Sequence, residues 1–296
     1  MDKTHRHTAA ISMKPRSRLV RNVRPARRLP HAFARSATIV AALTSLVFCA
    51  ASNAQLTPIA SDGFAYPSGS LAGQNGGSGW TSAWTLTYGP GGDFDVTSSG
   101  LSYPGLTDSG GSIVWGSGGV TGISEDARSL PLQNSGIVYI QFLCQFGSSS
   151  GGGTPNIRLL NGGTLTGGFG ANGGTFGGSI SILDANLQPN GDGSSSSSAS
   201  LSDLNLVIGR IDYVNNVTMM WVNPNLATFD YLNPTGANAV YDGLAPSFDS
   251  IAIYSRSPAN LDELQIMAPV PEPTSSLLIS IGVAAIVCGS RRRRRR

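Results

Sequence analysis

The sequence predicts an all-β protein built as a jelly-roll β-sandwich, and three observations predict it. From Gln55 onward, no stretch of ten residues without Gly or Pro places apolar residues at i, i+3, i+4 and i+7, so amphipathic helices are not expected there. Short runs of β-branched and aromatic residues recur instead, some with period-two alternation. Glycine-rich turns, as at residues 151–153, 161–163 and 172–174, separate these runs. Many short strands at this spacing are typical of a β-sandwich or jelly roll.

Eight strands are expected from these runs. They lie near Gly111–Trp115, Gly136–Phe146, Asn156–Leu160, Ser179–Leu183, Asn205–Tyr213, Thr218–Val222, Ser247–Tyr254 and Asp262–Ile266. The run IVYIQFLCQF at 137–146 is apolar over much of its length, which is typical of a central strand buried on both faces. Cys144 within it is expected to be a small core residue rather than a reactive thiol. By contrast, Gly191–Ser200 contains five consecutive serines and predicts a solvated, flexible connection.

The chain begins with a basic leader that predicts a signal peptide. Ser36–Ala51 is a short apolar run followed by small residues, which predicts export through the Sec pathway with cleavage between Ala54 and Gln55. Translation could start at Met1 or at Met13 without changing this prediction. The alternative is a permanent N-terminal anchor, but the apolar run is short for spanning a membrane.

Charge is strongly segregated along the chain. Ten basic residues precede Ser36 and six end the chain, whereas between Gln55 and Val270 four arginines and no lysine stand against fifteen acidic residues. This central region therefore carries a net charge of about −11, which repels phosphate backbones and argues against nucleic acid as a partner. All three histidines precede the predicted cleavage site, so histidine-dependent catalytic triads and histidine-ligated metals are excluded from the mature domain. Cys144 is its single cysteine, which excludes a disulfide framework.

The C-terminal tail has three parts in strict order. They are Pro271-Glu272-Pro273, an apolar run from Leu277 to Cys288, and Arg291–Arg296. Each proline fixes φ, so the first part is short and rigid. The apolar run has the composition of a membrane-inserted helix, and the arginines would hold its cytoplasmic end. This order resembles the PEP-CTERM sorting tail of exported proteins of Gram-negative bacteria, and the resemblance implies recognition by an exosortase-type membrane enzyme.

The two ends of the chain therefore predict its route and its organisation. The expected partners in transit are the export translocon and the exosortase-type enzyme. An inner-membrane intermediate held by the C-terminal helix is expected to precede the cell envelope, the surface or an extracellular matrix. Three parts follow: a signal peptide at 1–54, a β-sandwich domain at 55–268, and a sorting and anchor tail at 269–296.

The first mature segment carries the most distinctive motif of the domain. It reads DGFAY at 62–66 and GSLAGQNGGSGW at 69–80, followed by Trp84. Together with GRIDY at 209–213 and LDELQI at 261–266, these residues resemble a group of exported planctomycete-type proteins. Those proteins combine a concanavalin A-like, LamG-like jelly roll with a PEP-CTERM tail. The resemblance implies a fold rather than an activity.

Gln74, Asn75, Trp80 and Trp84 are candidate ligand-binding residues. Pyranose rings have apolar C–H faces and polar rims, so a carbohydrate site needs an aromatic platform beside amide or carboxylate groups, and these four residues supply both types. The alternative is that both tryptophans pack the N-terminal closure of the sandwich, and this alternative is favoured. Polysaccharide is the candidate extracellular partner.

Asp93 and Asp95 are candidate calcium ligands. Because side chains alternate along an extended strand, the two carboxylates project to one side, and carboxylate oxygens suit this hard cation. An exposed acidic loop would have the same sequence, and the EF-hand spacing is absent. The alternative is therefore that the domain binds no cofactor.

A glycoside hydrolase or lyase that acts on extracellular polysaccharide is the alternative function. Glycoside hydrolysis usually needs two carboxylates about 5–10 Å apart. Glu125 and Glu263 are the only glutamates between Gln55 and Val270, and the laminarinase-type E-x-D-x-x-E motif is absent. The sequence therefore favours a non-catalytic, surface-tethered or matrix-associated protein, with carbohydrate binding as the specific hypothesis.

Overall fold

The computed structural model describes residues 56–90, 92–115, 122–146, 155–171, 179–190 and 194–270, and their regular structure is entirely β. The first eight strands are β1 (Leu56–Asp62), β2 (Gly69–Ser70), β3 (Thr85–Tyr88), β4 (Asp95–Thr97), β5 (Ser112–Trp115), β6 (Ser124–Gln133), β7 (Ile137–Phe146) and β8 (Asn156–Asn161). The remaining eight are β9 (Thr164–Ala171), β10 (Ser179–Leu183), β11 (Ser196–Ser200), β12 (Asn205–Asp212), β13 (Val217–Val222), β14 (Ala239–Asp242), β15 (Phe248–Ser255) and β16 (Ala259–Pro269). Within the described ranges no helix is long and apolar enough to cross a membrane.

Two predicted segments lie outside the described residues. One is the leader with its cleavage site at Ala54 and Gln55, and the other is the tail from Pro271 onward. The described part runs between them, and its two ends meet, because Leu56 of β1 and Pro269 of β16 are paired residues.

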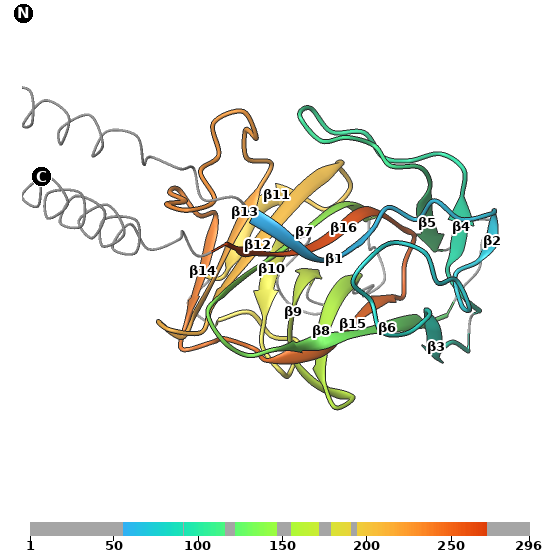
Figure 1. Cartoon of the computed structure of the whole chain (residues 1–296), viewed down its shortest axis with the longest axis horizontal. Helices are drawn as coiled ribbons and strands as arrows, with labels where there is room; N and C mark the ends of the chain where they lie inside the picture. The colour runs from blue at the N-terminus through green and yellow to red at the C-terminus, as the bar shows by residue number, and fades with distance from the viewer. Residues whose placement is uncertain are drawn as a thin grey trace, which may run out of the picture. The chain divides into compact units, whose positions relative to one another are not determined.

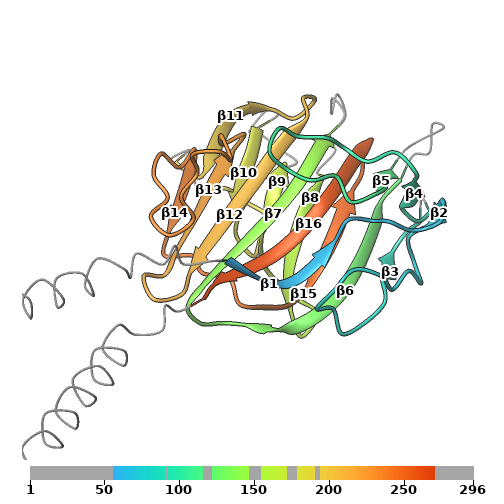
Figure 2. The same cartoon turned by 45° about the horizontal axis from the view of Figure 1, so that its top comes forward.

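The strands form two antiparallel sheets (Figures 1 and 2). The nine-stranded sheet has the order β14-β13-β12-β7-β16-β5-β4-β2, with β1 also paired to β16, and the seven-stranded sheet has the order β11-β10-β9-β8-β15-β6-β3. The chain passes from one sheet to the other between β6 and β7, and again between β15 and β16. Strands β6 and β15 are neighbours in the seven-stranded sheet, and the strands that follow them, β7 and β16, are neighbours in the nine-stranded sheet. The four strands therefore form one long two-stranded ribbon that passes from one sheet to the other, as in a jelly roll. The predicted jelly-roll β-sandwich is confirmed.

The eight predicted strands are all present, with ends shifted by a few residues. The central-strand prediction for 137–146 is confirmed, since β7 lies between β12 and β16 and eight of its ten residues are buried. Cys144 is fully buried in this strand, and burial raises the pKa of its thiol well above the usual value, so it is the inert core residue that was expected.

The prediction of a flexible connection at Gly191–Ser200 is wrong at its C-terminal end. Residues 196–200 form β11, which pairs with β10 through Ser181 and Ser196. The hydroxyl groups of these two serines lie 2.8 Å apart. Sheet pairing satisfies the backbone whatever the side chain is, and the serine hydroxyls add a cross-strand hydrogen bond, so composition alone misleads at this position.

Apolar side chains pack on two faces of the nine-stranded sheet. One cluster fills the interior of the sandwich and includes Phe142, Phe169 and Ile251. A second cluster on the nine-stranded sheet, around Tyr139 and Trp221, packs against apolar residues of two long loops. Those loop residues are Leu101, Tyr103 and Leu106 between β4 and β5, and Leu226, Phe229 and Tyr231 between β13 and β14. Figure 2 shows the course of the two loops. Loops therefore cover part of the outer face of the nine-stranded sheet.

Candidate functional site

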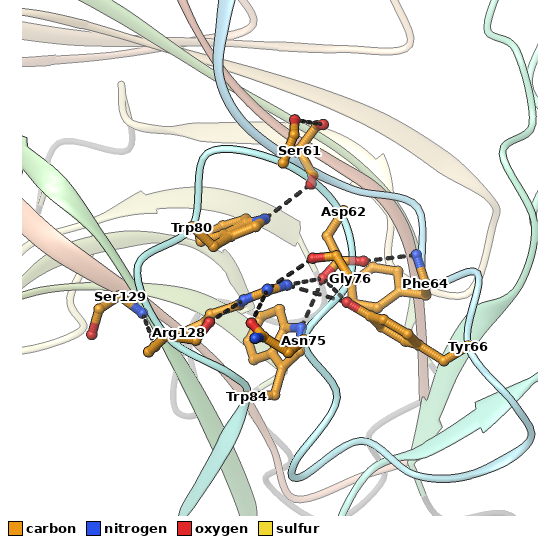
Figure 3. A network of polar contacts seen from close by, with 12 residues as sticks. Ser61, Asp62, Phe64, Tyr66, Asn75, Gly76, Trp80, Trp84, Arg128 and Ser129 are labelled. Carbon is orange, nitrogen blue, oxygen red and sulfur yellow. Dashed lines mark hydrogen bonds and ion pairs between the residues drawn. The ribbon is translucent and has the colours of Figure 1, made fainter.

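The distinctive N-terminal motif folds around one buried arginine, Arg128 of β6 (Figure 3). Its Nη1 lies 2.6 Å from Oδ2 of Asp62, and both side chains are 1% exposed. The same carboxylate accepts hydrogen bonds from the Tyr66 hydroxyl at 2.6 Å, the Trp84 indole N–H at 2.8 Å and the Phe64 backbone N–H at 2.9 Å. Asp62 is therefore a buried carboxylate with one cation and three further donors.

The guanidinium of Arg128 is equally well satisfied on its other sides. Nη2 donates to Oδ1 of Asn75 at 3.1 Å and to the carbonyl oxygen of Gly76 at 2.8 Å, and Nε donates to the carbonyl oxygen of Ser82 at 2.8 Å. Its Cζ atom lies 5.1 Å from the ring centroid of Trp80, within cation–π range. A buried charge with this many partners ties the N-terminal segment to β6.

The four candidate ligand-binding residues occupy different places around this network. Asn75 holds the guanidinium, and Trp84 is 1% exposed with its N–H directed to Asp62. Trp80 is half-buried and donates its N–H to the carbonyl oxygen of Ser61 at 2.9 Å. Gln74 is exposed. No face of Trp84 is open for a sugar ring in this arrangement, so the pair of tryptophans packs the end of the sandwich.

A groove of about 790 Å³ lies over the outer face of the seven-stranded sheet. Strands β3, β6, β8 and β15 and the turn at 162–163 line it. On β6 the side chains alternate, so that Asp126 and Arg128 are buried while Glu125, Ala127 and Ser129 face the groove. Sequence reasoning missed this site, because β6 itself was not predicted.

An ion pair with an aromatic contact forms the most ordered part of the groove. Nη1 of Arg158 pairs with Oε2 of Glu125, and the two side chains are 16% and 15% exposed. The hydroxyl of Thr87 donates to Oε1 of Glu125 at 2.8 Å, and Nε of Arg158 donates to Oδ1 of Asn156 at 3.1 Å. The guanidinium lies over the ring of Tyr254, with Cζ 3.5 Å from the centroid. These contacts fix the polar groups before any ligand arrives.

The rest of the groove mixes polar and apolar surface. Asp249 lies at one side, where both carboxylate oxygens accept from the Gly162 backbone N–H at 3.1 Å. Hydroxyl groups come from Thr81, Thr85 and Ser250, and apolar surface comes from leucines 160 and 165. A concave surface that combines fixed polar groups with apolar patches is the usual form of a small-molecule or saccharide site.

A second, smaller pocket of about 390 Å³ lies near Trp221 and Phe229. Its amide groups are used inside the protein. Asn223 accepts from the Leu206 backbone N–H at 2.8 Å, and Asn238 accepts from the Val222 backbone N–H at 2.7 Å. These two amide oxygens therefore hold the backbone at the end of the sheet.

The structure does not bring Glu125 and Glu263 together. Glu125 lies in the seven-stranded sheet, whereas Glu263 lies on β16 of the nine-stranded sheet and accepts from the Ser109 hydroxyl at 2.7 Å. Glu263 instead forms a group with Asp108 and Asp262, whose ligand oxygens lie within 4.8 Å of one another. Burial, followed by the charges of Glu263 and Asp108, raises the pKa of Asp262 to about 7 against two backbone hydrogen bonds that lower it.

Glu263 also has an unusual backbone, with φ of 51° at a point where the pairing register of β16 and β7 shifts. The resulting bulge turns consecutive side chains, Asp262 and Glu263, into buried positions. Local sequence spacing does not show this bulge.

The two candidate calcium ligands also separate in the structure. Asp95 is exposed, whereas Asp93 is half-buried and lies against Asp126 of β6. The residues that the structure brings together are thus Asp93 and Asp126.

Comparison with known proteins identifies the tail. Residues 269–295 match the PEP-CTERM protein-sorting motif, which confirms the predicted sorting tail. No curated protein sequence matches the chain.

Several solved structures are similar to more than half of the chain. A glycosyl hydrolase family protein from Mycobacterium fortuitum is 13% identical, with 71% of this chain and 99% of that chain covered and a TM-score of 0.41. A family 16 glycosyl hydrolase from Mycobacterium smegmatis is 12% identical, with 71% and 100% covered and a TM-score of 0.40. A sialidase is 9% identical with a TM-score of 0.40; the match covers 62% of this chain and spans only 16% of the sialidase. The firm assignment is therefore the C-terminal one: the chain ends in a PEP-CTERM sorting motif, the mark of an exported protein directed to the cell envelope.

Proposed function

We propose that this protein is an exported, non-catalytic β-sandwich that is tethered at the cell surface or held in an extracellular matrix, where it binds a neutral polysaccharide. The PEP-CTERM motif supports the location. In this proposal the chain is exported through the Sec translocon, passes through an inner-membrane intermediate and is handled by an exosortase-type enzyme. The groove of the seven-stranded sheet, with its fixed group of Glu125, Arg158 and Tyr254, is the observation that carries the binding function.

Charge favours a neutral ligand. The region between Gln55 and Val270 has a net charge of about −11, and the groove itself contains Glu125 and Asp249 against the single cation of Arg158. An acidic polymer would be repelled both at a distance and at the surface. Neutral sugar hydroxyls can both donate to the carboxylates and accept from the threonine and serine hydroxyls of the groove.

The contacts of the groove carboxylates favour binding over hydrolysis. Both oxygens of Glu125 are engaged, one by Thr87 and one by Arg158, and both oxygens of Asp249 accept from Gly162. A glycosidase needs one carboxylic acid to protonate the leaving oxygen and a second carboxylate to act on the other face of the sugar ring. Glu263, the other glutamate of the domain, lies in the other sheet.

Binding of the purified full chain to a panel of neutral and acidic polysaccharides tests this proposal. We expect a neutral polysaccharide to bind, and we expect Arg158→Ala to weaken its affinity about tenfold, because a hydrogen-bonding and stacking group is lost at the centre of the groove. Arg256→Ala, at an exposed arginine after β15, is the matched control and is expected to leave affinity unchanged. Equal loss in the two variants, or no binding across the panel, would contradict the proposal. Release of shorter saccharides, measured by mass spectrometry, would replace it with the glycoside hydrolase or lyase alternative.

A further inference from the structure

Asp93 and Asp126 form a carboxyl pair that joins the two sheets at one end of the sandwich. Asp126 lies on the inward face of β6 in the seven-stranded sheet and is 0% exposed. Asp93 immediately precedes the edge region of the nine-stranded sheet, where β4 begins two residues later. The two carboxyl groups are close enough to share a hydrogen bond when one of them carries a proton.

Each carboxyl group is anchored by one oxygen and leaves the other without a partner. Oδ2 of Asp93 accepts from the Ser70 hydroxyl and from the Ala72 backbone N–H, the latter at 2.9 Å. Oδ2 of Asp126 accepts from the Ser124 hydroxyl at 3.3 Å. The Oδ1 atoms of both aspartates are buried and have no hydrogen-bond partner among the described residues. Asp126 is thus a fully buried side chain with an unpartnered oxygen at a second carboxylate.

Two carboxylate oxygens cannot satisfy each other, because both are acceptors. In keeping with this, burial, followed by the hydrogen bond and the charge of the neighbouring Asp93, raises the pKa of Asp126, against hydrogen bonds from the Phe94 backbone and Ser124 that lower it. The pair therefore requires either a shared proton or a cation at neutral pH.

No arginine of the region between Gln55 and Val270 is placed to neutralise this pair. Arg128 is paired with Asp62, Arg158 with Glu125 and Arg210 with Asp212. The fourth arginine of the region between Gln55 and Val270, at position 256, is exposed, and that region contains no lysine or histidine. A cation that neutralises the Asp93–Asp126 pair has to come from solution.

We propose that Asp93 and Asp126 bind one calcium ion through their unpartnered oxygens. The nearby groups are carboxylate and hydroxyl oxygens, which suit a hard cation rather than one that prefers nitrogen or sulfur. Calcium tolerates irregular oxygen coordination, whereas magnesium requires near-ideal octahedral geometry. The ion would link β6 of the seven-stranded sheet to the β4–β2 edge of the nine-stranded sheet. The site keeps one of the two ligands expected from the sequence and replaces exposed Asp95 with buried Asp126.

Thermal unfolding of the full chain in EDTA, in calcium and in magnesium tests this site, together with calorimetric titration of calcium. At free calcium about 100 times the dissociation constant, we expect the Tm to rise by about 5–10 °C, with one ion bound at this pair. Asp93→Asn and Asp126→Asn are expected to abolish that rise. Asp95→Asn, at an exposed carboxylate two residues from Asp93, is the matched control and is expected to keep it.

Terbium luminescence gives a second measurement that does not depend on stability. We expect terbium to bind the native chain and calcium to displace it, with both signals lost in Asp93→Asn, which keeps the test decisive even where Asp126→Asn does not fold. Identical unfolding of the native chain in EDTA and in calcium, with no terbium signal, would show that a shared proton rather than an ion completes the pair and would overturn the proposal. Loss of the calcium response in Asp262→Asn, with the response kept in Asp93→Asn, would move the ion to the other acidic group and also overturn it.

Discussion

Asp62 at the end of β1 and Asp126 on β6 are both buried, yet their surroundings differ. Asp62 is 2% exposed and has the guanidinium of Arg128 and three further donors within 2.9 Å. Asp126 is 0% exposed, has the Ser124 hydroxyl at 3.3 Å, and lies beside another carboxyl group. Arg128 of β6 thus neutralises Asp62, whereas Asp126, two residues before Arg128 on the same strand, has no cation paired with it among the described residues.

The difference separates a structural ion pair from a site that responds to its surroundings. A buried pair that is complete within the protein keeps its charge state over a wide range of pH and ion concentration. A buried carboxyl pair without an internal cation changes with both, since a proton or a metal ion completes it. Predictions about the two aspartates should therefore differ in size and in their dependence on solution conditions.

The largest expected effect comes from removing the cation of the complete pair. Arg128→Met would leave Asp62 buried without a partner charge, and we expect the free energy of unfolding to fall by about 3–5 kcal/mol in urea titrations. Arg158→Met is the control, because its partner Glu125 is partly exposed and water can replace the lost contact; we expect a loss of about 1 kcal/mol or less. Equal losses in the two variants would mean that the buried Asp62 pair contributes no more to the free energy of unfolding than the partly exposed Glu125 pair.

A smaller effect, of opposite sign at neutral pH, is expected at Asp126 when calcium is removed by a chelator. The pKa of Asp126 is raised to about 8 in the folded protein and is near 3.8 in a free chain. The folded state therefore holds a proton that the unfolded state has lost, and stability falls as the pH rises from about 4 to about 8. Asp126→Asn should remove this slope and be more stable than the native chain at pH 8, on the order of 1–3 kcal/mol.

Urea titrations at several pH values in EDTA measure this difference. Asp262 has a pKa raised in the same direction, so the native chain and the Asp126→Asn variant share its contribution, and the difference between them isolates Asp126. A native chain and variant with parallel pH profiles would show that Asp126 does not hold a proton in the folded state.

The contrast also shows what the sequence could and could not predict. The sandwich and the central strand at 137–146 were predictable because contiguous apolar runs determine burial along a strand. Strand β6 was missed because SEDARSL at 124–130 places a serine, an aspartate and an arginine toward the interior, where the alternation rule expects apolar residues. Two of these inward groups are Asp126 itself and Arg128, the partner of Asp62.

The other contacts could not be predicted because they join residues that are far apart in the sequence. Arg128 lies 66 residues from Asp62, and Glu125 lies 33 residues from Arg158. Local spacing paired Asp93 with its neighbour Asp95, but the fold places Asp126 of another strand beside Asp93. The motif around Trp80 and Trp84 was visible, but the arginine at its centre comes from a strand that sequence reasoning did not find.

The smallest expected effects come from removing one hydrogen-bond donor from Asp62 or from Asp126. Tyr66→Phe removes a 2.6 Å hydrogen bond to Asp62 but leaves Arg128, Trp84 and the backbone donor in place, so we expect a loss of about 1 kcal/mol. Ser124→Ala removes the longer hydrogen bond to Asp126, and we expect a loss of about 0.5 kcal/mol or less. Urea titrations of both variants in calcium measure these values. A loss in Tyr66→Phe as large as that in Arg128→Met would show that the donors around Asp62 act as one unit, so that the cation alone does not keep the carboxylate charged in the interior.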